Sequence, residues 1–149
     1  MKIAIASDHA GYAGKEKLKL LLNELGIAFE DLGTVSEESV DYPDYAARVA
    51  KEVARGGADQ GLLVCGSGTG MAIAANKVPG VRAAVAWNEE SARLARQHND
   101  ANVLSIGARL TPEPELAKIV RTFFTTRFDG GRHAKRVEKI MELEKKCGD

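Results

Sequence analysis

The chain has 149 residues, 44% of them hydrophobic, and its 21 basic side chains balance 21 acidic ones. That length allows one domain with a sizeable core, the balanced charge argues against a nucleic-acid partner, and no apolar run approaches the roughly 20 residues that cross a bilayer. Two cysteines without framework spacing, and an N-terminal segment that reaches Asp8 too early for a signal peptide, predict a cytoplasmic protein with no membrane partner.

Short apolar runs alternate with amphipathic segments along the chain. Leucines recur on one helical face of residues 15–25, Gly26 ends that segment, and Pro79 and Gly80 end a later one. In chain order we expect strand 2–7, helix 15–25, strand 27–33, helix 45–55, strand 61–66, helix 69–77, strand 81–87, helix 89–97, strand 102–107, helix 112–126 and helix 132–146.

Strands separated by helices of this length imply crossovers that build a parallel sheet with helices on both faces. The predicted fold class is therefore α/β, a doubly wound three-layer α/β/α sandwich with a five-stranded parallel sheet. No repeat, low-complexity tract or linker interrupts the chain, so residues 1–149 are expected to form a single domain.

This fold directs attention to one edge of the sheet. Ligands of open α/β sheets bind beyond the carboxyl ends of the strands, near the point where the strand order reverses. Here three of those ends carry polar residues and glycines, in the segments 7–9, 65–68 and 107–109. We expect these segments to meet and to form a site.

Cys65 has two interpretations. It follows the apolar run 62–64, and free cysteines are among the most buried residues, so taken alone it fits a core position. The glycine-rich loop behind it opens a helix, whose unpaired backbone amides would favour a thiolate at Cys65 and an anion over the loop.

The sequence lacks the motifs of three common phosphate-binding sites. "GSGTGMAIAANK" has neither the spacing nor the Lys-Ser/Thr pair of a P-loop, and the first strand leads into "SDHAG" rather than GxGxxG. A cysteine phosphatase would need an arginine at position 71, which is Met71.

The three histidines, His9, His98 and His133, all fall in expected loops or helix ends. Each fits a solvent-facing residue, and because no close His/Cys/carboxylate spacing appears, we expect no metal site and no cofactor. The pairs Asp8-His9 and His98-Asn99 fit hydrogen bonds to a hydroxylated ligand.

Arg132 and Arg136 share one face of the last expected helix. Two guanidinium groups suit a phosphate or a carboxylate. A solvated charged face is the other interpretation of "RHAKRVEKIMELEKK", and the preceding Gly130 and Gly131 favour a site only slightly.

The chain resembles the type B ribose-5-phosphate isomerases, which share a family with bacterial isomerases of galactose and allose phosphates. The resemblance extends over nearly the whole chain, in the blocks "IASDHAG", "VDYPDYA", "CGSGTGMAIAANK", "RQHNDANVLSIGAR" and "FDGGRHAKRVEKI". It implies a Rossmann-like sandwich, a sugar-phosphate substrate, and interconversion of ribose 5-phosphate and ribulose 5-phosphate without a metal. It also implies a homodimer, or a dimer of such dimers, in which the last helix reaches the site of the partner.

The resemblance implies a role for each matching residue. Cys65 is the general base that moves a proton between C2 and C1, and His98 opens the sugar ring with Asp8 as a neighbouring polar contact. The backbone amides of the glycine loop and the Ser67 hydroxyl form the anion hole for the enediolate (Gly66, Ser67, Gly68, Thr69 and Gly70). The remaining residues hold the phosphate and the hydroxyl groups (His9, Asn99, Arg109, Arg132 and Arg136), and the last two arginines come from the partner.

Two positions depart from common patterns of this family. Ser67 stands where many members carry threonine, which keeps the hydroxyl, and Met71 stands where members without the cysteine carry a glutamate base. Cys65 is then the candidate base. Two alternatives remain open, namely an isomerase of six-carbon sugar phosphates and a module that binds a sugar phosphate without converting it.

Overall fold

The computed structural model describes residues 1–147 and confirms the predicted α/β order of strands and helices. Its elements are β1 (Lys2–Ser7), α1 (Tyr12–Glu24), β2 (Ala28–Asp31), α2 (Tyr42–Ala54), β3 (Gln60–Cys65), α3 (Thr69–Ala75), β4 (Ala83–Val85), α4 (Glu89–Asn99), β5 (Val103–Gly107), α5 (Glu113–Thr125) and α6 (Arg132–Cys147).

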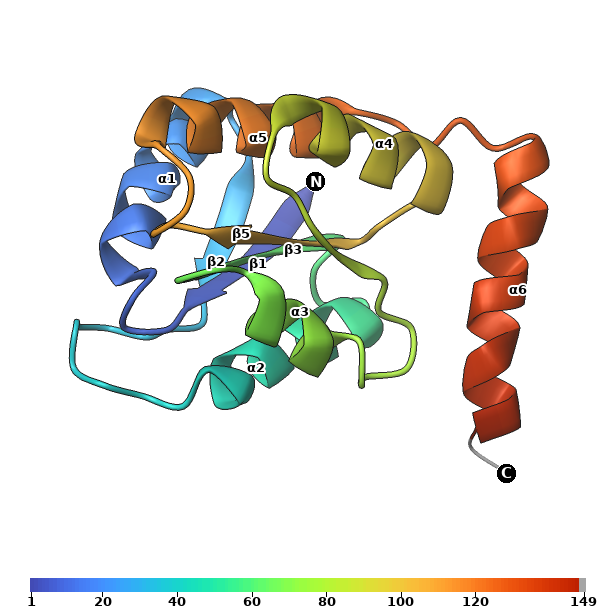
Figure 1. The fold of residues 1–149 in the computed structure, drawn as a ribbon, viewed down its shortest axis with the longest axis horizontal. Helices are drawn as coiled ribbons and strands as arrows, with labels where there is room; N and C mark the ends of the chain where they lie inside the picture. The colour runs from blue at the N-terminus through green and yellow to red at the C-terminus, as the bar shows by residue number, and fades with distance from the viewer. Residues whose placement is uncertain (148–149) are drawn as a thin grey trace.

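The five strands form one parallel sheet in the order β2-β1-β3-β5-β4 (Figure 1). The chain goes from β1 outward to β2 and then crosses back to β3, so the strand order reverses between β1 and β3. In the sheet register Ser7 lies beside Val64, and Cys65 lies beside Gly107. The carboxyl ends of β1, β3 and β5 therefore meet at the switch point, where doubly wound sheets bind ligands.

Helices cover both faces of the sheet, as the sequence predicts (Figure 1). One core cluster joins α1, α4 and α5 to the sheet through side chains such as Leu22, Ala92 and Phe123. The other joins α2 and α3 through side chains such as Val49 and Met71. The apolar strands are buried between these two layers, which gives the sheet edge a rigid support.

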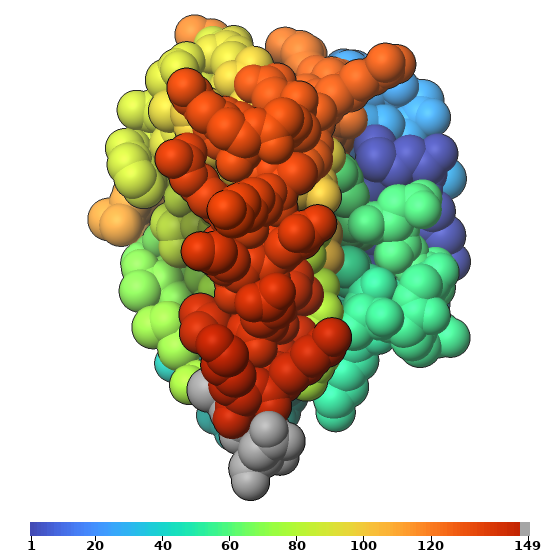
Figure 2. All heavy atoms as spheres, turned by 90° about the vertical axis from the view of Figure 1, so that its right-hand side faces the viewer, coloured from blue at the N-terminus to red at the C-terminus, as the bar shows by residue number. Residues whose placement is uncertain are grey.

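The last helix, α6, lies beside the sandwich rather than on either face of the sheet (Figure 1). Seen from that side, it runs down the molecule across the edge of the sandwich (Figure 2). Its contacts include a hydrogen bond from the Gly80 N–H to Glu144 at 2.8 Å and one from Arg82 to the sulfur of Met141 at 3.3 Å. Ile140 and Leu143 on this helix remain exposed.

Some element boundaries differ from those that the sequence predicts. Helices α1 and α2 each begin three residues earlier than expected, and α2 takes Pro43 into its first turn, where a missing N–H costs no hydrogen bond. Strand β4 is only three residues long. Side-chain oxygens of Asn102 and Asn76 accept the backbone N–H groups of Arg82 and Ala83, both at 2.7 Å, where β4 begins.

No helix within residues 1–147 has both the length and the apolar character needed to cross a membrane.

Candidate active site

The end of β1 places Asp8 and His9 at the switch point. Asp8 is 7% exposed, and its carboxylate accepts the Gly11 N–H at 2.9 Å. His9 accepts the Val40 N–H on Nδ1 at 3.1 Å. Because Nδ1 is an acceptor, the ring hydrogen of a neutral His9 lies on Nε2, which is left as a donor for a ligand.

The end of β3 places Cys65 beside them, with 5% of its surface exposed. The Gly68 N–H donates to its sulfur at 3.0 Å. Burial raises the pKa of the Cys65 thiol above its ordinary value, and the charge of Asp8 raises it further, while the Gly68 hydrogen bond opposes both effects. The resting group is therefore a thiol near neutral pH, next to an amide that stabilises the thiolate once it forms.

Two positions of the loop after Cys65 require glycine for structural reasons. Gly68 has φ 84°, a left-handed conformation that side chains disfavour, and it directs the chain into α3. A Cβ atom at Gly70 would lie 2.7 Å from the ring of Tyr42, so only glycine lets this ring pack on the loop. Ser67 is exposed, and its hydroxyl accepts the Thr69 N–H at 3.3 Å.

The turn after β5 runs alongside this loop. The Ala108 and Arg109 N–H groups donate to the carbonyls of Cys65 and Gly66 at 2.7 and 3.1 Å. The Arg109 side chain lies over Gly66, where a Cβ atom would be 3.5 Å from a guanidinium nitrogen. Arg109 is exposed, so its charge remains available to an anion.

These segments enclose a cavity of about 390 Å³, within the size range of small-molecule sites. Seven of the predicted residues line it: Asp8, His9, Cys65, Gly66, Ser67, Gly70 and Arg109. Ala10, Tyr42 and Leu110 complete the wall. The sequence analysis missed Tyr42 as a site residue, although "VDYPDYA" carries it, because its ring reaches the loop only through the fold.

Six predicted residues do not line this cavity: Gly68 and Thr69 of the glycine loop itself, and His98, Asn99, Arg132 and Arg136. Helix α4 begins at the carboxyl edge of the sheet and ends at the opposite edge, where α6 begins with Arg132. In Figure 1 the loop from β1 into α1 lies on the left and α6 on the right. Within one chain, Asp8 and His98 are therefore not neighbours.

His98 instead stacks on His133 at the start of α6, with ring centroids 4.2 Å apart and planes inclined by 13°. Partial burial and the proximity of His98 lower the pKa of His133. Asn99 lines a second cavity, of about 460 Å³, between α6 and the sheet edge.

Donor atoms of His98, Asp129 and His133 all lie within 4.8 Å of one another, a grouping that the sequence spacing did not indicate. A metal ion needs ring nitrogens whose lone pairs, which lie in the ring planes, converge on one point. The two rings are nearly parallel, so at least one must rotate before both can reach one ion. Arg132 and Arg136 add positive charge nearby, since both contribute to lowering the pKa of His133.

Known proteins of one family match this chain over nearly its whole length. A family model described as Ribose/Galactose Isomerase matches residues 3–140. The chain is 47% identical to ribose-5-phosphate isomerase B of Escherichia coli over 146 residues, which cover 97% of either chain.

Solved structures agree over the same length. The structure of ribose-5-phosphate isomerase B of Clostridium thermocellum matches with a TM-score of 0.96 and 50% identity, covering 98% of this chain and 99% of that one. The enzyme of Mycoplasma genitalium, solved with bound ribulose-5-phosphate, matches with a TM-score of 0.93 and 43% identity, covering 97% and 96%.

Proposed function

The chain belongs to the Ribose/Galactose Isomerase family, and we infer that it interconverts ribose 5-phosphate and ribulose 5-phosphate. The observation that carries this conclusion is the end-to-end match to relatives of that activity, one of which holds the ketose product. The cavity at the switch point supports this inference, because a thiol, an imidazole and a guanidinium group line it, from Cys65, His9 and Arg109.

In this proposal Cys65 is the base. Its thiolate removes the proton from C2 of the open-chain aldose, and the electron pair moves through C1 to O1 to give an enediolate. The proton of the O2 hydroxyl then passes to O1, a carbonyl forms at C2, and the thiol returns its proton to C1 to give the ketose. A proton next to a carbonyl is weakly acidic, so donors must stabilise the developing oxyanion. We assign this task to the amides of residues 66–70 and to the Ser67 hydroxyl, with Asp8 and Asn99 as hydroxyl contacts.

The phosphate group is a permanent charge, remote from the reacting carbons. From one chain, the His9 Nε2–H and the Arg109 guanidinium face the cavity as donors. Binding energy from this end of the sugar orients C1 and C2 at the thiol. One arginine and one histidine form only part of the phosphate site that the resemblance implies.

We propose that a second copy of the chain completes the site. His98, Asn99, Arg132 and Arg136 gather at the edge far from the cavity of their own chain, although each has an expected role in the reaction. Helix α6 carries both arginines beside the sandwich and leaves Ile140 and Leu143 exposed, as a helix that packs on a partner would. A homodimer, or a dimer of such dimers, lets this edge meet the cavity of the other copy.

The galactose in the family description makes six-carbon sugar phosphates the second candidate substrates. We expect kcat/KM for ribose 5-phosphate to exceed that for allose 6-phosphate and galactose 6-phosphate, because a fixed distance between the phosphate grip and Cys65 suits one chain length. Kinetic assays of the purified protein on all three sugars measure this. A kcat/KM for a hexose phosphate one hundred times that for ribose 5-phosphate would make the hexose phosphate the substrate. Binding of the sugar phosphates without turnover would show a non-catalytic module.

The raised pKa of Cys65 predicts a pH dependence of catalysis. Only the thiolate is a base, so kcat/KM should rise about tenfold per pH unit below the pKa of the thiol. Asp8→Asn removes a charge that raises this pKa, so the rising limb should move to lower pH. The pH dependence of alkylation by iodoacetamide, in a Cys147→Ser background, measures the thiol directly.

Asp59→Asn is the matched control for this charge change. Asp59 accepts the Lys2 N–H at the amino end of β1, at the far edge of the sheet, and its loss should leave both profiles in place. An Asp8→Asn profile that moves to higher pH, or that stays unchanged in both assays, would contradict the proposed coupling between Asp8 and Cys65.

A further inference from the structure

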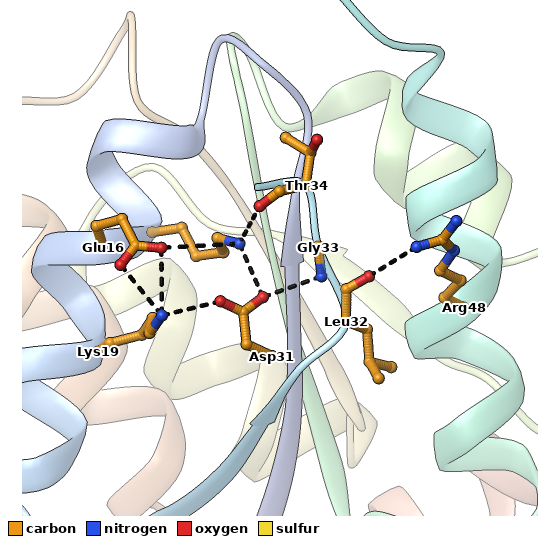
Figure 3. Close-up of polar contacts among 8 residues, drawn as sticks. Glu16, Lys19, Asp31, Leu32, Gly33, Thr34 and Arg48 are labelled. Atoms are coloured by element: carbon orange, nitrogen blue, oxygen red, sulfur yellow. Dashed lines mark hydrogen bonds and ion pairs between the residues drawn. The ribbon is translucent and has the colours of Figure 1, made fainter. Parts of the chain in front are cut away.

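Lys15 is a fully buried cation that the proposed reaction does not use. It lies one turn into α1 and is 0% exposed. Its ammonium group donates to the Asp31 carboxylate at 2.8 Å and to the Thr34 carbonyl at 2.6 Å (Figure 3). Because burying a charge is costly unless it is paired, this position needs a specific reason.

The carboxylate partner of Lys15 is itself held ionised. Burial alone would raise the pKa of Asp31, but hydrogen bonds from Lys15, from the Gly33 N–H and from Lys19 outweigh it and lower the pKa. Lys19 binds the other carboxylate oxygen at 2.9 Å from a side chain that is 25% exposed (Figure 3). Two lysines thus share one carboxylate, one of them buried and the other reaching solvent.

The segment that Lys15 holds is bonded directly to the end of β1. The Ser7 N–H donates to the Gly33 carbonyl at 2.7 Å, and the Thr34 N–H donates to the Ser7 carbonyl at 2.9 Å. Ser7 is the residue before Asp8. The Lys15 ammonium group therefore fixes the strand end from which Asp8 and His9 enter the cavity.

The same segment begins the loop that forms the rest of this wall. Residues 34–41 lead from Thr34 to α2, and on this loop the Val40 N–H binds Nδ1 of His9. Tyr42, whose ring packs on Gly70, follows directly. The strand end that carries His9 and the loop that binds its ring thus both adjoin the 33–34 segment that Lys15 anchors.

We propose that Lys15 is a positioning residue for the phosphate grip, acting through His9. The inference rests on the proposed function for its kinetic consequence, but the contacts of Lys15 with Thr34 and of Thr34 with Ser7, two residues before His9, are independent of it. Lys15 holds the segment that presents His9 with Nδ1 occupied and Nε2 donating. Without it, His9 loses its fixed tautomer and orientation, and the sugar phosphate binds less well.

The test compares Lys15→Met with Lys19→Met. Both substitutions remove an ammonium group bound to Asp31, but only Lys15 also holds Thr34. We expect Lys15→Met to raise KM for ribose 5-phosphate about tenfold with kcat within about twofold, and Lys19→Met to change neither. In Lys15→Met, ¹⁵N NMR of the His9 ring should show exchange between tautomers, whereas the wild type shows the Nε2–H form.

A double-mutant cycle separates positioning from a general loss of structure. If Lys15 acts through His9, then Lys15→Met combined with His9→Ala should bind no more weakly than His9→Ala alone. Additive effects, an unchanged His9 signal, or equal effects of the two lysine substitutions would overturn the proposal. Where Lys15→Met fails to fold, Asp31→Asn replaces it, because this substitution removes the charge that helps to hold the Lys15 ammonium group at Thr34. It should show the same changes in smaller measure. An unchanged KM together with an unchanged His9 signal in Asp31→Asn would contradict the proposal.

Failure of the proposed function would look different. In that case the wild type would not convert ribose 5-phosphate, yet the His9 tautomer and the binding of ribose 5-phosphate by calorimetry would still respond to Lys15→Met. If the wild type is active and neither of these responds, the positioning role alone is wrong.

Discussion

Replacing Cys65 with alanine should lower kcat for ribose 5-phosphate by about 10²–10⁴-fold, the range that a positioned general base contributes. Binding of the sugar phosphate should stay nearly unchanged, because the phosphate is held by other groups. The substitution removes one buried sulfur atom and leaves the backbone of the glycine loop intact, so the fold should persist. Steady-state kinetics, calorimetric binding, and deuterium exchange at C2 in heavy water measure these effects.

Cys147→Ala, which removes the chain's other thiol, is the matched control and should leave kcat unchanged. Cys65→Ser separates basicity from size, because a hydroxyl is a far weaker acid than a thiol, and it should be as inactive as Cys65→Ala. Exchange at C2 at the wild-type rate in Cys65→Ala would exclude the thiol as the base. A second group in the cavity would then have to be found.

A mixture of two inactive variants should recover activity if the site is shared between chains. In a mixed dimer of Cys65→Ala and Arg136→Ala, one cavity has Cys65 from one chain and Arg136 from the other, while the second cavity has neither. Random pairing makes half of the dimers mixed, so about a quarter of all cavities are intact. Co-expression with two affinity tags, followed by assay well below KM, measures this recovery.

Cys65→Ala mixed with Arg109→Ala is the matched control for this experiment. Both residues line the cavity of one chain, so a mixed dimer contains no intact cavity and should recover nothing. Recovery in this control, or its absence with Arg136→Ala, would contradict the assignment of the α6 arginines to the partner's site. An active monomer in sedimentation experiments would contradict the dimer itself.

The fold was predictable from local patterns in the sequence. Apolar runs such as 62–64 separate amphipathic helices of ordinary length, and this alternation determines a parallel sheet covered on both faces. The boundaries were less predictable. The sequence predicts a helix from residue 45, but Pro43 is compatible with the first turn of a helix, so α2 begins at Tyr42.

The candidate site was predictable only in part, for a physical reason. Residues that follow strand ends, such as Asp8, Cys65 and Arg109, are brought together by the sheet itself, and the structure confirms that they share one cavity. Sequence order does not reveal contacts made through side-chain packing. The ring of Tyr42 on Gly70 and the hydrogen bond of the buried Lys15 to the Thr34 carbonyl depend on such packing, and neither was anticipated.

The resemblance identified His98 and Asp8 as neighbours, but the path of α4 separates them within one chain. A single sequence names residues without saying from which copy each one comes. The stacking of His98 on His133 holds these two rings together at the start of α6, and in the proposed dimer they would act at the cavity of the other copy.

A crystal structure of the protein with a linear sugar phosphate would test the chemistry most directly. The proposal predicts the Cys65 sulfur about 3–3.5 Å from C1 and C2, which is the separation of a group aligned for proton transfer. The oxygens on these carbons should face the amides of the glycine loop. A ligand bound elsewhere, or a sulfur directed into the core and away from both carbons, would contradict it.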